Sequence, residues 1–215
     1  MDHSDKPRRA PAAAQRGAQA RVLRIIGGSW RGRKLRFPPS PEIRPTPDRV
    51  RETLFNWLGP YLSGARCLDL FAGSGALGLE SLSRGAAQVT FVERDPAAAR
   101  ELKARLTEWG ATGARVEQSE ALRFLGIARG PEIGPFNIVF LDPPFDSDLL
   151  AQTADLLEKG SLLAPVALIY VECAARKGLP PLPRNWSATK AKQAGEVGYY
   201  LLTRSQGNLG ESPPA

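Results

Sequence analysis

One stretch of the sequence decides the fold: residues 67–78 read CLDLFAGSGALG. Its first residues are mostly apolar and predict a buried strand. Gly73 and Gly75 then allow a tight turn because they lack Cβ atoms, and apolar residues at helical spacing follow. The N-terminus of such a helix favours a carboxylate or a phosphate. Nucleotide sites, flavin sites and plain tight turns share this arrangement, so the stretch predicts a strand–turn–helix unit and leaves its ligand open.

Two common ligand motifs are absent from this turn. Phe71 stands where a dinucleotide-binding Gly-x-Gly-x-x-Gly motif has its first glycine. The turn also lacks the Gly-Lys-Ser/Thr ending of a phosphate-binding P-loop. The sequence therefore disfavours dinucleotides and nucleoside triphosphates as the ligand.

From residue 65 onward, strand and helix patterns alternate along the chain. We expect strands at 65–70, 88–93, 114–118, 137–141 and 166–172, and helices near 75–84, 96–109, 119–125 and 147–159. The last two strands, 186–192 and 196–203, are joined by Gln193-Ala194-Gly195 and predict a hairpin. Alternation of this kind predicts an α/β fold: a doubly wound, mostly parallel sheet covered on both faces, closed by an antiparallel C-terminal hairpin.

The first 60 residues differ from the rest of the chain. Residues 1–20 lack apolar periodicity and predict a disordered basic leader, and residues 21–60 predict a small basic extension made of a strand and a helix. We expect the helix to begin with Thr46 as its N-cap and Pro47 as its first residue. The main domain then covers residues 61–204, and residues 205–215 form a disordered polar tail.

The positive charge is concentrated in this N-terminal part. The chain has a net charge of +7, and residues 1–60 hold 13 Lys and Arg against 5 Asp and Glu. Residues 61–215 hold 16 against 17. A basic excess confined to one segment is typical of binding to a polyanion such as nucleic acid, although a basic arm can also serve solubility alone.

Composition removes several classes of function. The only histidine, His3, falls in the leader, so we expect neither histidine catalysis nor a metal site. Cys67 and Cys173 both fall in predicted strands without metal-ligand spacing and predict buried free thiols in a reducing compartment. No apolar run is long enough to cross a membrane, and the N-terminus lacks the apolar core of a secretory signal.

A second stretch carries the chemistry: residues 138–145 read IVFLDPPF. The apolar run predicts a buried strand, and the two prolines end it, so Asp142 stands at the carboxyl end of that strand. Asp142 and the Pro143 carbonyl can accept the two hydrogens of an exocyclic amine on a nucleic-acid base and thereby localise its lone pair. Phe145 can stack on the base, which contributes roughly 1–3 kcal/mol. The plain alternative is a Pro-Pro turn with a helix-capping acid.

Two further strand ends complete a candidate cofactor site. Glu93 ends the second predicted strand, where an acid can bind a ribose diol, although a surface acid is the plain alternative. The loop Ser119-Glu120-Ala121 follows the third strand and can border an adenine ring. S-adenosylmethionine fits this arrangement, since it is a nucleoside with a charged amino-acid tail, which Asp69 or the turn amides can hold.

These motifs carry a family resemblance. The stretch DLFAGSG at 69–75, Glu93 and DPPF at 142–145 resemble the motifs of class I S-adenosylmethionine-dependent amino-methyltransferases. The segments RIIGG, RGRKL, RPT and DRVRE, at 24–28, 31–35, 44–46 and 48–52, narrow the resemblance to the bacterial RsmD family. That family methylates the N2 amine of one guanine in 16S ribosomal RNA. The resemblance spans about residues 21–203, and Glu120 departs from the usual loop.

The resemblance implies a seven-stranded class I methyltransferase sheet and a cytoplasmic, monomeric enzyme that acts on 16S ribosomal RNA in an assembling small subunit. The catalytic residues would be Asp142, Pro143, Pro144 and Phe145. The residues that bind S-adenosylmethionine would be Asp69, Phe71, Ala72, Gly73, Gly75, Glu93, Arg94 and Ala121. The RNA-binding residues would be Arg24, Arg31, Arg33, Lys34, Arg36, Arg44, Thr46 and Arg49.

Two other functions use the same residues. A DNA amino-methyltransferase relies on the same tetrapeptide, but 215 residues leave little room for a separate sequence-reading domain. A catalytically silent ribosome-assembly factor can share the fold, although the intact Asp142-Pro-Pro-Phe145 motif argues against it. The residues alone fix neither the modified nucleotide nor the form of the RNA substrate.

Overall fold

The computed structural model describes residues 21–37, 46–128, 130 and 132–205. The predicted leader 1–20, the connector 38–45 with Arg44, and residues 206–215 lie outside the described residues, as does the side chain of Arg36. The sequence-based predictions for these parts therefore stay predictions.

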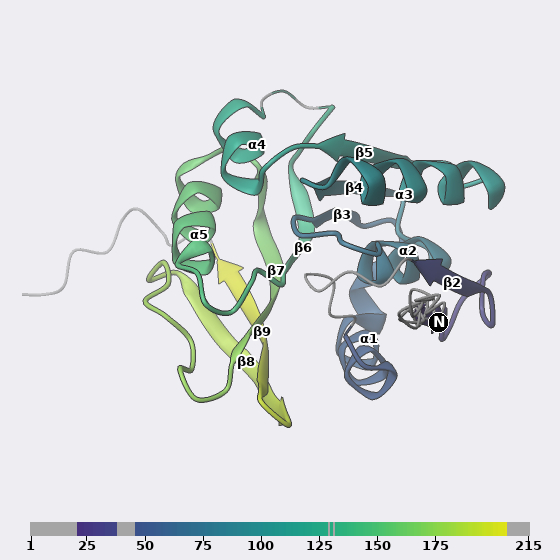
Figure 1. The fold of residues 1–215 in the computed structure, drawn as a ribbon. Coiled ribbons are helices and arrows are strands. Elements are labelled where there is room, and N and C mark those ends of the chain that lie inside the picture. The colour runs from purple at the N-terminus through teal and green to yellow at the C-terminus, as the bar shows by residue number, and fades with distance from the viewer. Residues whose placement is uncertain (1–20, 38–45, 129, 131, 206–215) are drawn as a thin grey trace, which may run out of the picture.

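The main body is a seven-stranded sheet with strand order β5-β4-β3-β6-β7-β9-β8 (Figure 1). Its strands are β3 (Arg66–Asp69), β4 (Gln88–Glu93), β5 (Ala114–Gln118), β6 (Phe136–Leu141), β7 (Leu163–Ala174), β8 (Trp186–Ala194) and β9 (Val197–Ser205). The first five are mutually parallel, and β9 pairs antiparallel with both β7 and β8. The predicted doubly wound sheet with a C-terminal antiparallel hairpin is confirmed.

In the described part of the chain, five helices cover the sheet: α1 (Asp48–Leu62), α2 (Ala76–Ser83), α3 (Pro96–Glu108), α4 (Ala121–Ile127) and α5 (Leu149–Lys159). The first three pack on one face and the last two on the other, each with its own apolar core. Alternate residues of β6 belong to the two cores: Phe140 packs in the core under α1, α2 and α3, and Val139 packs in the core under α4 and α5. Burial on both faces explains why β6 is a continuous apolar run.

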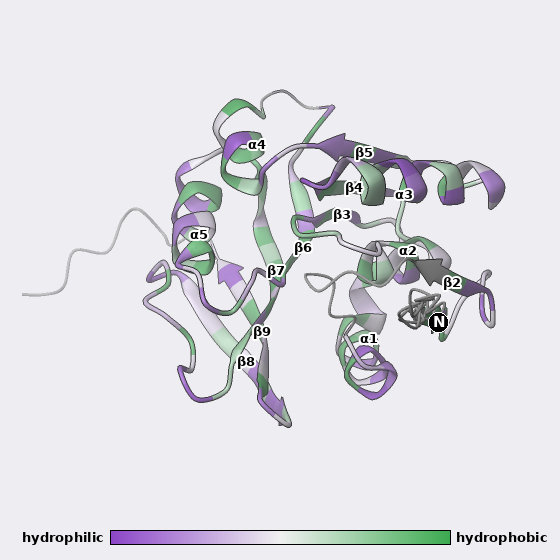
Figure 2. Ribbon diagram, viewed as in Figure 1, coloured by the Kyte–Doolittle hydropathy of each residue, from purple (hydrophilic) through white to green (hydrophobic). Residues whose placement is uncertain are grey.

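The edge of the sheet differs from its centre. Figure 2 shows hydrophobic residues along β6 and β7, whereas β5 at one edge is mostly hydrophilic. None of the five residues of β5 is fully buried. Charged side chains on an edge strand disfavour pairing with another chain, so this composition suits an exposed edge.

The N-terminal segment forms a separate two-stranded hairpin, β1 (Arg21–Arg24) with β2 (Lys34–Phe37). The hairpin is clamped to α2 by the buried carboxylate of Glu80, which accepts hydrogen bonds from the Ile26 and Gly27 amides, both at 2.8 Å. The fully buried Arg51 of α1 lies 3.7 Å from that carboxylate and donates to the Arg24 carbonyl at 2.9 Å. A buried ion pair thus links hairpin, α1 and α2.

Two local predictions were wrong. Thr46 does not cap α1: Pro47 holds the N-cap position without a side-chain bond, and the Thr46 hydroxyl donates instead to Glu172. The tertiary partner outcompetes the local cap. The C-terminal hairpin turns at Gly195-Glu196 and not at residues 193–195, because Gly195 has a φ of 59°, which suits the first central position of a two-residue turn.

Candidate active site

The strand order reverses between β3 and β6, because β4 and β5 lie on one side of that pair and β7 on the other. Ligands of open α/β sheets bind at such a switch point, outside the carboxyl ends of the strands. Asp69 ends β3 and Asp142 directly follows β6, its parallel neighbour. The glycine turn after β3 and Asp142 after β6 therefore lie next to each other at the same edge of the sheet.

The carboxylate of Asp142 has an unusual environment. Burial raises its pKa well above the ordinary value, and the nearby carboxylates of Glu172 and Asp69 raise it further. Within the described part of the chain, no group donates a hydrogen bond to either of its oxygens. A carboxylate held without donors is prepared to accept hydrogens from a ligand, since leaving it unsatisfied costs free energy.

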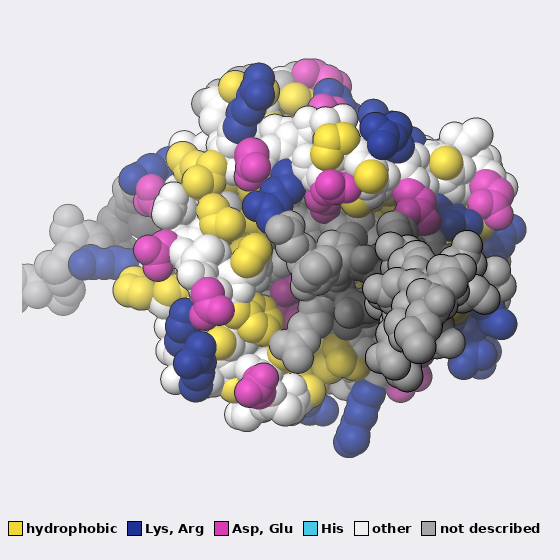
Figure 3. Space-filling model, in the orientation of Figure 1, with side chains coloured by type: hydrophobic (Ala, Val, Ile, Leu, Met, Phe, Trp, Pro, Cys, Tyr) yellow, Lys and Arg dark blue, Asp and Glu magenta, His cyan; other side chains and the backbone are white. Residues whose placement is uncertain are grey.

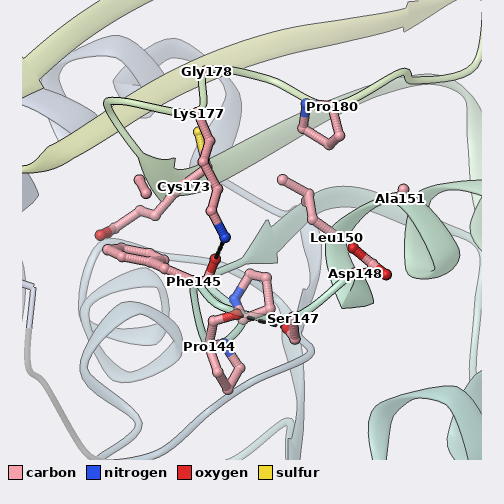
Figure 4. Close-up of a pocket in the computed structure, with 13 residues that line it drawn as sticks. Pro144, Phe145, Ser147, Asp148, Leu150, Ala151, Cys173, Lys177, Gly178 and Pro180 are labelled. Atoms are coloured by element: carbon pink, nitrogen blue, oxygen red, sulfur yellow. Dashed lines mark hydrogen bonds between the residues drawn. The ribbon is translucent and has the colours of Figure 1, made fainter.

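The loop after β6 is fastened on both sides. The Ser147 hydroxyl donates to the Pro144 carbonyl at 2.6 Å, and the Lys177 amine donates to the Phe145 carbonyl at 3.0 Å (Figure 4). No donor among the described residues reaches the Pro143 carbonyl. The loop thus keeps one buried backbone acceptor free beside Asp142, and Phe145 remains partly exposed for stacking.

The glycine turn has the geometry that its sequence predicts. Gly73 and Gly75 have left-handed φ values of 50° and 75°. A Cβ on Gly75 would lie 2.6 Å from the Leu102 side chain. The Gly73 amide donates to Glu93 at 2.7 Å, so the predicted ribose acid also supports the turn.

The predicted ribose acid, Glu93, is engaged at both oxygens. One accepts from Gly73 and the other from the Asp95 amide at 2.7 Å. Each carboxylate oxygen has a second lone pair, so the group can still accept ribose hydroxyls. Because two amides hold it, its orientation is fixed before any ligand binds.

Asp69 has a structural partner that the sequence did not reveal. Its carboxylate accepts the Gly78 amide of α2 at 3.0 Å and is only 3% exposed. Burial raises the pKa of Asp69 to about 7, although the Gly78 amide opposes the rise. Asp69 therefore fixes the first turn of α2 against β3, and only its remaining lone pairs can serve a ligand.

The other predicted cofactor residues lie around the same strand ends. Phe71 and Ala72 form the turn after β3, and the Ala72 amide donates to the Val92 carbonyl at 3.0 Å. Arg94 is exposed directly after β4, and Ala121 is buried at the start of α4. The residues from three loops thus border one edge, as the prediction requires.

Sequence reasoning missed Glu172. Glu172 lies in β7 and is only 4% exposed. The hydroxyls of Thr46 and Tyr170 both donate hydrogen bonds to its Oε1 atom, at 3.0 and 2.8 Å. A signal existed, since Glu172 is the only acid in an apolar run that ends beside Asp142. The same bond shows that the Thr46 side chain is buried against Glu172, and its predicted role as an RNA-binding residue stays a prediction.

The predicted RNA-binding cations of the hairpin lie on the surface. Arg24, Arg31, Arg33 and Lys34 are exposed, as is Arg49 on α1. Figure 3 shows Lys and Arg side chains gathered at the edge of the molecule beside β2. The Arg33 guanidinium lies 5.3 Å from the ring centre of Trp109, which the sequence analysis did not single out, and the Trp30 ring contacts Trp109 edge-on at 5.3 Å.

The residues present suit S-adenosylmethionine. The Gly73 and Gly75 turn lies at the carboxyl end of β3, Glu93 is a fixed acceptor for hydroxyls, and no described group donates to Asp142. In the described ranges, no group of three His, Cys, Asp or Glu side chains has the arrangement of a metal site. No helix within those ranges is long and apolar enough to span a bilayer. Cys67 and Cys173 are buried free thiols, as predicted.

Comparisons with known proteins agree with this geometry. The family model described as Conserved hypothetical protein 95 matches residues 23–203. The chain is 55% identical to ribosomal RNA small subunit methyltransferase D of Escherichia coli over 182 residues, which cover 85% of this chain and 90% of the relative. It is 48% identical to the protein of the same name from Haemophilus influenzae, covering 83% and 92%.

Solved structures extend the comparison to the fold. The Escherichia coli protein yhhF superposes with a TM-score of 0.77 at 52% identity, covering 86% of this chain and 99% of that one. An RNA methyltransferase from Salinibacter ruber, solved with S-adenosyl-L-homocysteine, superposes with a TM-score of 0.57 at 16% identity, covering 78% and 100%. The second likeness shows the class I methyltransferase fold.

Proposed function

Because this chain belongs to the family of ribosomal RNA small subunit methyltransferase D, we propose that it methylates the exocyclic N2 amine of a guanine in 16S ribosomal RNA, with S-adenosylmethionine as methyl donor. The observation that carries the proposal is that no described group donates to the Asp142 carboxylate or to the Pro143 carbonyl beside it, at the switch point of the sheet. The enzyme would work as a cytoplasmic monomer on an assembling small subunit.

The bound cofactor would supply a methyl group activated by its sulfonium. Gly73, Gly75 and Glu93 would hold it, with Phe71, Ala72, Arg94 and Ala121 around its nucleoside. The residues of the loop after β6 would hold the base: Asp142 and the Pro143 carbonyl each accept one amine hydrogen, and Phe145 stacks on the ring. This would aim the nitrogen lone pair at the methyl group that the sulfonium supplies, and the amine would release one of its two held protons as it gains the methyl group.

Catalysis would come mainly from orientation. An exocyclic amine is a weak nucleophile, because its lone pair is delocalised into the ring. Two acceptors that hold its hydrogens out of the ring plane make the lone pair available along one direction. Holding reacting atoms in line removes several kcal/mol from a barrier. The base must first leave its stack, which costs a few kcal/mol.

The RNA contacts would come from the basic hairpin. Arg24, Arg31, Arg33 and Lys34, with Arg36, Arg44 and Arg49, would bind phosphates, because they concentrate positive charge on the N-terminal segment. Phosphate contacts position an RNA without reading its sequence. The choice of base must therefore come from the pocket at the strand ends.

Methyl transfer from labelled S-adenosylmethionine tests the proposal. The enzyme should label 16S ribosomal RNA, or small-subunit particles, from a strain that lacks the corresponding gene, and nuclease digestion with mass mapping should place the label on one guanine as N2-methylguanine. Duplex DNA is the matched control substrate. Label in DNA would favour a DNA amino-methyltransferase, and no transfer to any substrate would favour a silent assembly factor.

A further inference from the structure

The carboxylate of Glu172 lies next to that of Asp142. The strands β6 and β7 are parallel neighbours with Leu141 paired to Val171, so the following residues, Asp142 and Glu172, stand side by side at the carboxyl ends. The charge of Glu172 contributes to raising the pKa of Asp142, in keeping with this placement. An amine held by Asp142 can therefore place a neighbouring ring atom toward Glu172.

The carboxylate of Glu172 is held in one orientation and is only half satisfied. Thr46 and Tyr170 both donate to Oε1, whereas no described group donates to Oε2. Burial raises the pKa of Glu172, and the two hydroxyl donors oppose that rise and favour the charged form. Oε2, to which no described group donates, is available to accept a hydrogen bond from a ligand.

Glu172 also faces the place where a base would lie. It lines a cavity of about 150 Å³ together with Pro143, Phe145 and Lys177. Figure 4 shows this cavity between the loop after β6, the start of α5 and the turn after β7, with Phe145 and Pro144 on one wall and Pro180 on another. Pro143, whose carbonyl is one of the two predicted amine acceptors, and the predicted stacking ring of Phe145 thus border the same cavity as Glu172, and Asp142 directly precedes Pro143.

The three exocyclic amines of RNA differ in the ring nitrogen beside them. The amine of adenine is flanked by N1 and that of cytosine by N3, both of which are hydrogen-bond acceptors. The N2 amine of guanine is flanked by N3, an acceptor, on one side and by N1–H, a donor, on the other. A carboxylate oxygen on the N1 side of the amine therefore accepts from guanine, whereas adenine and cytosine present no N–H donor beside their amines. Enzymes read extruded bases by such contacts to the Watson–Crick edge.

We propose that Glu172 accepts the N1–H of the target guanine through Oε2 and thereby selects guanine over the other amine-bearing bases. The inference rests on the proposed function, because it assigns a partner to the ring atom beside the methylated amine. Thr46 and Tyr170 act as positioning residues for this acceptor. A site built to accept an N–H rejects an analogue without it strongly, because its buried acceptor is left unpaired.

The test uses 2-aminopurine, which keeps the 2-amine, replaces N1–H by a bare acceptor nitrogen and carries hydrogen in place of the C6 carbonyl oxygen. Substrate RNA is prepared with either guanine or 2-aminopurine at the mapped position, and kcat/KM is measured for both with the wild-type enzyme. We expect the wild type to prefer guanine by at least about 100-fold. Equal rates on the two RNAs would overturn the inference and leave the proposed function standing, whereas no transfer to the guanine RNA would overturn both.

Variants separate recognition from structure. In Glu172→Gln the carboxamide can donate to the bare nitrogen, so the preference for guanine should fall to below about 10-fold. Tyr170→Phe is the matched control, since it removes one hydrogen bond to Oε1 and keeps the Glu172 carboxylate. This variant should lower kcat/KM for the guanine RNA and the 2-aminopurine RNA together and preserve the ratio of the two. If folded Glu172→Gln preferred the guanine RNA over the 2-aminopurine RNA as strongly as the wild type does, the inference would be overturned. If that variant does not fold, the wild-type comparison decides alone.

Discussion

At the residue scale, two acids that look alike in the sequence have opposite surroundings. Glu93 and Asp142 both stand at strand ends. Both oxygens of Glu93 accept backbone amides, at 2.7 Å each, whereas no described group donates to Asp142. The first is fixed as part of the turn that would hold a cofactor, and the second is left for a substrate. This difference supports separate roles for two residues of the same chemical type.

Asp142→Ala should remove methyl transfer and retain cofactor binding. The variant loses one of two acceptors that localise the amine lone pair, so kcat should fall at least about 100-fold. The cofactor contacts on Glu93 and the glycine turn stay intact, and affinity for S-adenosylmethionine measured by calorimetry should change less than about threefold. Asp155→Ala, an equivalent change at an exposed acid, should leave both quantities unchanged. Full activity in Asp142→Ala would refute the assignment.

Asp69 predicts a pH dependence of stability. Its pKa is about 7 in the folded protein against 3.8 for the ordinary group. The folded state binds this proton more tightly, so the contribution to stability is full below about pH 4 and is lost as pH rises through 7. The loss amounts to roughly 4 kcal/mol at most. Asp69→Asn keeps an acceptor for the Gly78 amide and should flatten this fall.

Urea unfolding between pH 4 and pH 8 measures the effect of Asp69→Asn. The free energy of unfolding should decrease less steeply with pH in the variant than in the wild type. Asp155→Asn, on the exposed face of α5, serves as the control and should follow the wild-type curve. Parallel curves for wild type and Asp69→Asn would show that this carboxyl titrates normally.

At the element scale, α2 is the helix on which the site is built. Its first turn is bound by Asp69, its N-terminus follows the glycine turn, and Glu80 on it clamps the N-terminal hairpin. The helix therefore approaches β4 closely. A Cβ added to Gly78 would lie 2.2 Å from the ring of Phe91 on that strand.

Gly78→Ala should destabilise the protein by about 1–3 kcal/mol, because the extra methyl group overpacks the contact between α2 and β4. Gly126→Ala is the matched control. Gly126 lies in α4, where an added Cβ meets nothing within 4 Å, so the same change should be neutral or stabilise by up to about 1 kcal/mol. Thermal unfolding of both variants distinguishes a packing effect from helix propensity. Equal melting temperatures would contradict this account of α2.

Glu80→Ala should destabilise the protein by about 3–5 kcal/mol. The variant leaves the buried guanidinium of Arg51 with only the carboxylate of Asp48, and it leaves the Ile26 and Gly27 amides without their acceptor. Glu101→Ala, which removes a partly exposed pair with Arg105, should cost less than about 1 kcal/mol. Chemical unfolding gives both values. If Glu80→Ala lowered the free energy of unfolding no more than Glu101→Ala, the contacts of Glu80 with Arg51 and with the Ile26 and Gly27 amides would contribute little to stability.

At the scale of the whole molecule, charge and chemistry are divided between two parts of the chain. The basic excess belongs to the first 60 residues, and the candidate site is built from residues after 65. The buried link through Glu80 and Arg51 joins them, so the basic hairpin holds a fixed place on the face that carries α1, α2 and α3. RNA bound to the hairpin would therefore have a defined position relative to the strand ends.

Replacing Arg31, Arg33 and Lys34 together by Ala should weaken RNA binding and reduce its salt dependence. Each lost phosphate contact lowers the slope of log K against log salt by about 0.7–0.9. The control replaces three exposed cations on α3, α4 and α5, namely Arg100, Arg123 and Lys159, at the same change in net charge. Filter binding at several salt concentrations measures both. Identical slopes for the two triple variants would show that only net charge matters.

The sequence by itself determined the parallel sheet, the glycine turn, the positions of Asp142 and Glu93, and the basic N-terminal segment. Each of these follows from a local pattern: an apolar run ended by prolines, two glycines before a helix, or a count of charges. Only the tertiary structure decided what Thr46, Asp69, Glu80 and Glu172 do. Their partners lie in distant segments, and Thr46 and Glu172 are 126 residues apart. A local sequence pattern shows which chemical groups a residue has, whereas strand order and packing determine which other residues those groups contact.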